Sequence, residues 1–478
     1  MNSNVQNNNR SGIEKTEQQV FDTNHLSRTY LKLALPVALG MIITLLYNLA
    51  DTFFIAQTGD TDLVAGVSLC APIFTALMAF GNIYGQGGSS LISRLLGSEN
   101  REETRKVSSF CFYIAIVTGF ILGVLMLLFR NPLLILLGAN KETLPYAESY
   151  FIVMAAGSPF VVLSFIHMNF VRCEGMAVQS MVGGMLGSIV NIILDPIMIS
   201  LLKMGAAGAA VATVLGYVCT VVFFLILLSR RNRRSGLTSS GTPSDRVPSS
   251  MGPVLSVRMS DCHVDKGKLG QILGVGVTAA LANLMQSLSV IVLNHYLLPY
   301  GNTQIAAMGI AMKVNLIAQL IITGLAFGGV PLFGYLYGAS LENEMKRLIR
   351  FCIFFLGSLA LLLTVLLYVF ASPLIHGFMD HPSIIKDGTL MLRWLSAGTV
   401  FSSLVLLFTV LFQATGQVLS AFLMSVSRQG IIFLAAIAVG EALFGYIGIL
   451  AAQAAADVFS AILAVFLYQR FIRTIIPT

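Results

Sequence analysis

Long apolar runs separated by short polar segments dominate the chain. Each run is about 20 residues or longer, the length that an α-helix needs to cross the hydrocarbon core of a bilayer. The boundaries predict twelve membrane-spanning helices, at 30–56, 63–93, 107–129, 147–171, 178–202, 206–229, 269–297, 304–337, 348–371, 389–414, 418–440 and 445–468. The pattern lacks the alternating segments of about ten residues that are typical of barrel strands. It therefore predicts an all-α integral membrane protein.

The composition supports this prediction. The chain has 478 residues, of which 56% are hydrophobic and only 11% charged, whereas a soluble domain carries about 25% charged residues. A surface with so few charges must face lipid, where each backbone polar group needs an internal partner. The six cysteines are scattered and form no metal-ligand motif, so a disulfide scaffold or a structural zinc site is not expected.

The distribution of lysine and arginine predicts how the chain is oriented in the membrane. With twelve spans, 22 of the 29 basic residues fall on one side, five on the other, and Lys313 and Arg428 within spans. Positive charge marks the cytoplasmic side, so both termini and the central polar segment are expected to be cytoplasmic in a multi-pass protein of the cell (cytoplasmic or inner) membrane. The net charge of +7 is thus explained by topology, and no nucleic-acid partner is expected.

Polar composition divides the chain into five parts. We expect a cytoplasmic N-terminal tail (1–28), an N-terminal six-helix lobe (29–229), a cytoplasmic linker (230–267), a C-terminal six-helix lobe (268–470) and a cytoplasmic C-terminal tail (471–478). The linker is rich in Ser, Gly, Pro and Arg, which predicts a flexible segment. Its arginines set the topology and are also able to contact anionic lipid heads.

The two lobes form an internal repeat. A constant shift of 241 residues superimposes glycine and leucine positions: Gly87-Gly88 on Gly328-Gly329, Leu91 on Leu332, Gly97 on Gly338 and Gly175 on Gly416. Because six spans separate the two copies, both enter the membrane in the same direction, which makes a parallel repeat of the kind found in transporters. Two bundles that rock around a central binding site need such symmetry, whereas receptors and membrane enzymes rarely do.

Two carboxylates within spans are the main candidates for function, because each costs about 2.5–3.5 kcal/mol at the bilayer centre. Asp51 lies in the first span and Asp195 in the fifth, where Asn191 precedes it by one helical turn on the same face. Pro196 frees a backbone carbonyl near Asn191, and Thr213 in the sixth span adds a hydroxyl. Such oxygen ligands are typical of a hard-cation or proton site.

The candidate site has no copy in the second lobe, where the shift of 241 residues places Ala436 opposite Asp195 and a local alignment places Val290 opposite Asp51. The roles of Asp457, Lys313, Arg428 and His167 stay open, although packing is the simpler explanation for Asp457. No nucleotide-binding, hydrolase or metal-triad motif is present in the sequence. We therefore expect a protein that is not an enzyme, has no cofactor and uses an ion gradient.

Four sequence stretches resemble the multidrug and toxic compound extrusion family: LPVALGMIITLLYNLADTFFIA at 35–56, GQGGSSLISRLLG at 85–97, VRCEG at 171–175 and NIILDP at 191–196. The resemblance covers roughly residues 28–470. It implies a twelve-helix, two-lobed secondary transporter that exports organic cations in exchange for H⁺ or Na⁺. It also implies that Asp51, Asn191, Asp195 and Thr213 form the cation or proton site, and that Pro36 bends the first helix.

Three other functions compete with this reading. A flippase or exporter of a lipid-linked or metabolite cargo would carry cationic residues for phosphate, whereas the intramembrane charge here is mostly acidic. A membrane enzyme would need a catalytic constellation, and a sensor or channel rarely has a duplicated six-span half. We expect organic cations and membrane lipids as partners and a monomer as the working state, while the natural substrate and the choice between Na⁺ and H⁺ stay open.

Overall fold

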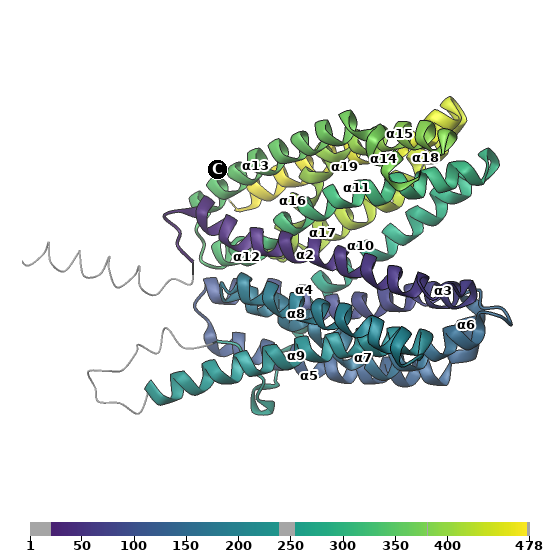
Figure 1. Ribbon diagram of the computed structural model, residues 1–478. Coiled ribbons are helices and arrows are strands. Elements are labelled where there is room, and N and C mark those ends of the chain that lie inside the picture. Colours follow the sequence, from purple (N-terminus) through teal and green to yellow (C-terminus); the bar gives the residue numbers. More distant parts are fainter. Residues whose placement is uncertain (1–20, 239–253, 380, 476–478) are drawn as a thin grey trace, which may run out of the picture.

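The computed structural model describes residues 21–238, 254–379 and 381–475, so most of the predicted N-terminal tail and the middle of the predicted linker lie outside the described residues. Two helical bundles lie side by side, one coloured purple to teal and one green to yellow in Figure 1. The N-terminal bundle contains α2 (Leu26–Ala56), α3 (Thr61–Leu69), α4 (Ala71–Gly97), α5 (Arg101–Leu128), α6 (Arg130–Leu136), α7 (Leu144–Cys173), α8 (Ala177–Pro196), the π-helical turn η1 (Ile197–Leu201) and α9 (Gly205–Thr238).

The C-terminal bundle repeats this order of helices. It contains α10 (Lys266–Leu297), the 3-10 turn η4 (Leu298–Tyr300), α11 (Asn302–Gly328), α12 (Val330–Gly338), α13 (Glu342–Val369), α14 (Ala371–Phe378), α15 (Pro382–Ala397), α16 (Thr399–Ala414), α17 (Val418–Val426), the π-helical turn η5 (Ser427–Ile431), α18 (Ile432–Phe444) and α19 (Tyr446–Ile475). The short helix α6 follows α5 as α14 follows α13, at the same shift of 241 residues.

The predicted twelve spans are confirmed. Eleven segments of the described chain are long and apolar enough to cross a membrane, and the pair α15–α16, bent by 42° at Gly398, makes the twelfth. Several spans consist of two helices because a proline starts the second one, as at Pro72 in α4 and Pro331 in α12. Proline has no backbone N–H to offer the preceding turn, so it favours a helix start over a helix interior.

One pair of repeated glycines, Gly97 and Gly338, lies where the two bundles touch. A Cβ atom on Gly97 would lie 2.1 Å from the carbonyl oxygen of Tyr335, and one on Gly338 would lie 2.0 Å from that of Arg94. The helices α4 and α12 therefore cross backbone to backbone, which only glycine permits. The internal repeat found in the sequence corresponds to a symmetric contact between the bundles.

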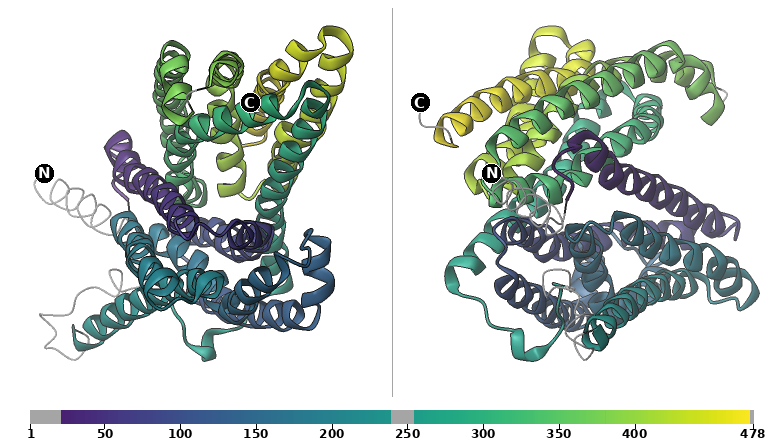
Figure 2. Two further views of the ribbon diagram at one scale, coloured as in Figure 1. Left: turned by 45° about the vertical axis from the view of Figure 1, so that its right-hand side comes forward. Right: turned by 90° about the vertical axis from the view of Figure 1, so that its left-hand side faces the viewer.

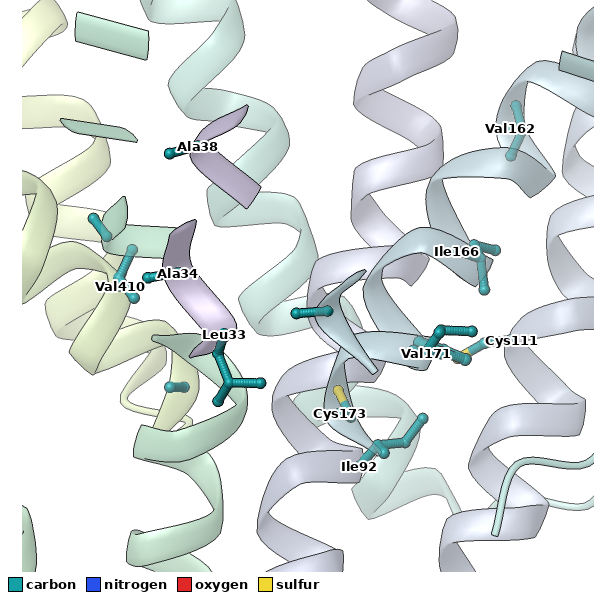
Figure 3. Close-up of a cluster of buried hydrophobic side chains, with 14 of the residues drawn as sticks. Leu33, Ala34, Ala38, Ile92, Cys111, Val162, Ile166, Val171, Cys173 and Val410 are labelled. Atoms are coloured by element: carbon teal, nitrogen blue, oxygen red, sulfur yellow. The ribbon is translucent and has the colours of Figure 1, made fainter. Parts of the chain in front are cut away.

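Further contacts between the bundles lie at the same end of the molecule, where α9 ends and α10 begins; we call it the linker end. The Tyr30 hydroxyl of α2 donates to the carbonyl oxygen of Leu325 in α11 over 2.8 Å. Figure 3 shows the apolar part of this region, with Leu33 and Ala34 of α2 near Val410 of α16. The linker end is thus closed by direct packing between the bundles.

The two described ends of the predicted linker are ordered. The helix α9 continues to Thr238, and Val254 and Leu255 are only 5% and 2% exposed. A flexible linker is therefore the wrong description for 254–257, because this apolar run, VLSV, packs on the N-terminal bundle. The short 3-10 helix η3 (Met259–Asp261) follows this run.

Candidate functional site

Three helices of the N-terminal bundle bring the predicted polar residues together. Asp51 comes from α2, Asn191 and Asp195 from α8, and Thr213 from α9. The helix α8 packs against both α2 and α9, so the face that carries Asn191 and Asp195 is enclosed. Asp195 is fully buried, and Asn191 and Thr213 are 2% and 4% exposed.

Hydrogen bonds link three of these four residues. The Asn191 amide Nδ2 donates to Asp195 Oδ1 over 3.3 Å and to Thr213 Oγ1 over 3.2 Å. Because both amide hydrogens are used, the amide is held in one orientation and its own oxygen Oδ1 points elsewhere. Asn191 is therefore the residue that orders the site.

Several oxygen atoms of the site have no hydrogen-bond partner. Buried oxygens without a partner include Asp51 Oδ1, Asn191 Oδ1 and Asp195 Oδ2. Buried polar atoms in proteins are nearly always paired, so such oxygens call for a ligand or a proton. Two carboxylates, an amide oxygen and a hydroxyl form a donor set that suits a hard cation, and either carboxylate is able to take up a proton instead.

Two tyrosines that the sequence does not single out lie near Asp51, and a third lies beside them. Tyr47 and Tyr150 interact electrostatically with Asp51, and Tyr217 interacts with both tyrosines. The helical register contains a signal for two of them, since Tyr47 precedes Asp51 by four residues and Tyr217 follows Thr213 by four. Their aromatic rings also offer faces that attract organic cations.

An irregular turn follows the site on α8. The helix ends at Pro196 and continues as the π-helical turn η1. Pro196 has no N–H for the turn that contains Asn191, and π-helical turns are frequent at functional sites. Pro36 lies inside α2, which stays one continuous helix through it.

Three of the four residues whose roles the sequence left open have structural partners. His167 is buried between the rings of Phe112 and Phe224, and its Nδ1 lies 3.3 Å from the carbonyl oxygen of Leu163. Asp457 forms an ion pair with Arg428, with Oδ1 2.7 Å from Nε. His167 is thus explained by packing, and Asp457 and Arg428 by their mutual pairing.

The remaining candidates lie away from the carboxylates. Lys313 is exposed on α11, and the repeat positions Val290 and Ala436 carry no polar side chain. Within the described ranges, no group of three or more His, Cys, Asp or Glu side chains is arranged to hold a metal ion. The polar cluster at Asp51 and Asp195 therefore remains the best candidate site.

Each bundle matches the sequence pattern of one known family. The MatE family pattern matches residues 36–197 and again 278–438, once in each bundle. The chain is a member of the MATE family. It is 31% identical over 448 residues to the multidrug export protein MepA of Staphylococcus haemolyticus (strain JCSC1435), covering 94% of each chain. It is also 31% identical over 431 residues to MepA of Staphylococcus aureus (strain N315), covering 90% of each.

Solved MATE structures have the same fold. An outward-facing multidrug resistance MATE transporter superimposes with a TM-score of 0.86 at 24% identity, over 95% of this chain and 97% of that one. A MATE crystal structure in a bent conformation gives 0.84 at 23% identity, over 94% and 96%. This MATE protein is therefore a multi-pass transporter whose two bundles each contain one copy of the family pattern.

Proposed function

We propose that this MATE protein is a secondary active multidrug exporter, which expels organic cations in exchange for H⁺ or Na⁺. The observation that carries the proposal is the pair of carboxylates, Asp51 and Asp195, each with a buried oxygen that has no partner. A proton or Na⁺ would neutralise this pair, with Asn191 and Thr213 completing an oxygen-lined site. The MepA relatives are named multidrug export proteins, which supports a drug-like cargo.

Exchange requires that the ion and the drug favour different states of the carrier. A ligand shifts a conformational equilibrium only by its differential affinity for the two states. In the proposed cycle, an ion arriving from outside at Asp195 and Asp51 favours release of the cationic drug. The carrier then opens inward, loses the ion to the cytoplasm and binds a new drug molecule.

The packing between the bundles supports alternating access. The linker end is closed through Gly97, Gly338 and the hydrogen bond from Tyr30 to Leu325, as expected of a carrier that faces outward. Opening toward the cytoplasm must separate α4 from α12. Pro36 lies on α2 between Tyr30 and Asp51, where a bend would couple the ion site to the closure.

The topology follows from the basic residues. We place the linker end and both termini in the cytoplasm, with the protein spanning the cell membrane as a monomer in contact with membrane lipids. Exposed apolar side chains form much of the outer surface of the spans, including Leu128, Phe354, Phe459 and Phe466. Such side chains suit acyl chains and are unfavourable in water.

The test is efflux of ethidium, a cationic dye, from proteoliposomes under an imposed H⁺ or Na⁺ gradient. We expect the parent protein to export the dye under one gradient and Asp195→Asn to lose the gradient dependence. Asp62→Asn, an exposed acid of the same bundle, is the matched control and should resemble the parent. Equal dye transport by Asp195→Asn would contradict the coupling site. No transport by the parent under either gradient would favour the lipid-linked or metabolite cargo.

A further inference from the structure

The segment Val254–Asp261, which we call the strap, is fixed to the N-terminal bundle by a buried carboxylate. Glu174, directly after α7, accepts the backbone N–H groups of Val254 and Leu255 at Oε1 over 2.7 and 2.9 Å. Its other oxygen, Oε2, accepts a hydrogen bond from Arg231 Nη1 of α9 over 2.6 Å and forms an ion pair with it. The Glu174 side chain is 5% exposed, so these charge-assisted bonds are shielded from water and salt.

The rest of the strap is held by α5. The Ser108 hydroxyl donates to the carbonyl oxygen of Ser256 over 3.0 Å, and the Tyr113 hydroxyl donates to that of Val257 over 3.0 Å. The side chain of Leu255 is buried in the core of this bundle. The helix α5 and Glu174 at the end of α7 thus hold the strap directly through its backbone, while Arg231 of α9 holds Glu174.

The attachment continues into α10. Lys268 forms an ion pair with Glu103 of α5. One turn later, a Cβ atom on Gly87 of α4 would lie 2.1 Å from the carbonyl oxygen of Ile272, and one on Gly276 would lie 1.9 Å from that of Ile83. The first half of α10 is therefore packed backbone to backbone on the N-terminal bundle.

The second half of α10 belongs to the other bundle. The Ser289 hydroxyl donates to the carbonyl oxygen of Gln429 in η5, and Leu293 is part of the separate core of the C-terminal bundle. The start of α2 shows the equivalent arrangement, because Tyr30 donates to the carbonyl oxygen of Leu325 in α11 and a Cβ atom on Gly328 of α11 would lie 2.3 Å from Cα of Ala34. The first helix of each repeat thus begins on the opposite bundle, an exchange visible in Figure 2.

We propose that the strap stays bound to the N-terminal bundle throughout the transport cycle and keeps the first half of α10 on that bundle while the C-terminal bundle moves. This proposal rests on the alternating access proposed above. On its other side, α10 contacts α17 of the C-terminal bundle through apolar packing of Gly274 on Val418. This apolar contact separates more readily than the charge-assisted hydrogen bonds of Glu174. The bend of α10 then falls between Gly276 and Ser289.

Two pairs of spin labels on the full-length protein in nanodiscs test the proposal. One pair, at Glu102 and Met259, joins α5 to the strap; the other, at Arg105 and Glu342, joins the two bundles, and all four positions are exposed. Pulsed electron paramagnetic resonance is recorded with and without ethidium, at pH 5 and pH 8. We expect the distance between the bundles to change while the Glu102–Met259 distance keeps one narrow distribution.

A Glu102–Met259 distance that shifts or broadens with the other pair would overturn the strap proposal. If the distance between the bundles never changes, alternating access fails instead, and the Glu102–Met259 distribution still reports whether the strap is bound.

Two substitutions in the strap test its role in transport. Leu255→Asp buries a charge in the strap contact, whereas Met259→Asp places the same charge where the side chain is 77% exposed. We expect Leu255→Asp to lower dye transport by roughly tenfold, because it places an unpaired charge in the buried contact that holds the strap.

Met259→Asp should transport like the parent. Glu174→Gln, which keeps an amide oxygen for the strap N–H groups but loses the charge that pairs with Arg231, should give an intermediate loss and a broadened Glu102–Met259 distribution. Parent-like transport in Leu255→Asp, with the protein folded, would contradict the proposal. If Leu255→Asp does not fold, Glu174→Gln and the parent label pairs decide the question.

Discussion

Replacing Gly97 by alanine should shift the carrier away from the state in which the linker end is closed. The new Cβ would lie 2.1 Å from the carbonyl oxygen of Tyr335, whereas ordinary contacts lie at 3.4–4 Å. Both atoms belong to or adjoin the backbone, so α4 and α12 must separate by more than 1 Å. Overpacking of this kind costs about 1–3 kcal/mol.

The cost applies only to the state in which α4 and α12 touch. A difference of about 1–3 kcal/mol between two states changes their ratio by roughly 5–150-fold. In the proposed cycle this change favours the inward-facing state. We therefore expect Gly97→Ala to lengthen the Arg105–Glu342 distance measured between spin labels, and to slow dye efflux because the return to the outward-facing state becomes unfavourable.

The control is Gly357→Ala in α13, where a Cβ would meet nothing within 4 Å. This change adds the same methyl group to a helix without a clash, so the label distance and the efflux rate should match those of the parent. The reasoning is refuted if Gly97→Ala leaves the Arg105–Glu342 distribution unchanged, or if Gly357→Ala shifts it equally.

Three further predictions concern other parts of the chain. Asp457→Asn should lower stability by roughly 3 kcal/mol because it leaves Arg428, whose side chain is only 14% exposed, without its countercharge. Thermal unfolding in detergent measures this loss, and Arg428→Met combined with Asp457→Leu should recover most of it. Thr213→Val should slow gradient-driven dye efflux by roughly fivefold, since it removes one acceptor of the amide of Asn191, worth about 1 kcal/mol, whereas Thr220→Val on the same helix should have little effect on coupling. Asp60 lies outside the spans, and the hydrogen bond from the Tyr146 hydroxyl lowers the pKa of its carboxyl group. Because folding lowers this pKa, the carboxylate stabilises the folded protein at neutral pH. This stabilisation is lost as the pH falls through the lowered pKa. The thermal midpoint of Asp60→Ala should therefore lie below that of the parent at pH 7, and the two should converge on acidification; a constant difference would contradict the assignment.

The sequence predicted the features that depend on short or repeated spacing. Asn191 and Asp195 lie one turn apart, so helical geometry alone places them on one face, and the structure joins them by a hydrogen bond. The repeat at a shift of 241 residues identified Gly97 and Gly338 before any contact was known. The twelve spans followed from hydrophobic length.

Features that depend on contacts between distant segments were not predictable in the same way. Arg428 and Asp457 are 29 residues apart on different helices, and only the packing of η5 against α19 shows that they pair. The strap was missed because the polar composition of 230–267, taken as a whole, conceals the apolar run at 254–257. Its partner Glu174 lies 80 residues before Val254.

Competition between ion and drug at the carboxylates of the N-terminal bundle is the central claim, and equilibrium binding tests it most directly. Ethidium binding to the purified protein is measured by fluorescence at several H⁺ and Na⁺ concentrations, for the parent and for Asp195→Asn. We predict that one of the two ions weakens binding to the parent and has no effect on binding to Asp195→Asn. Binding to the parent that is independent of both ions, or an equal ion effect in Asp195→Asn, would contradict the claim.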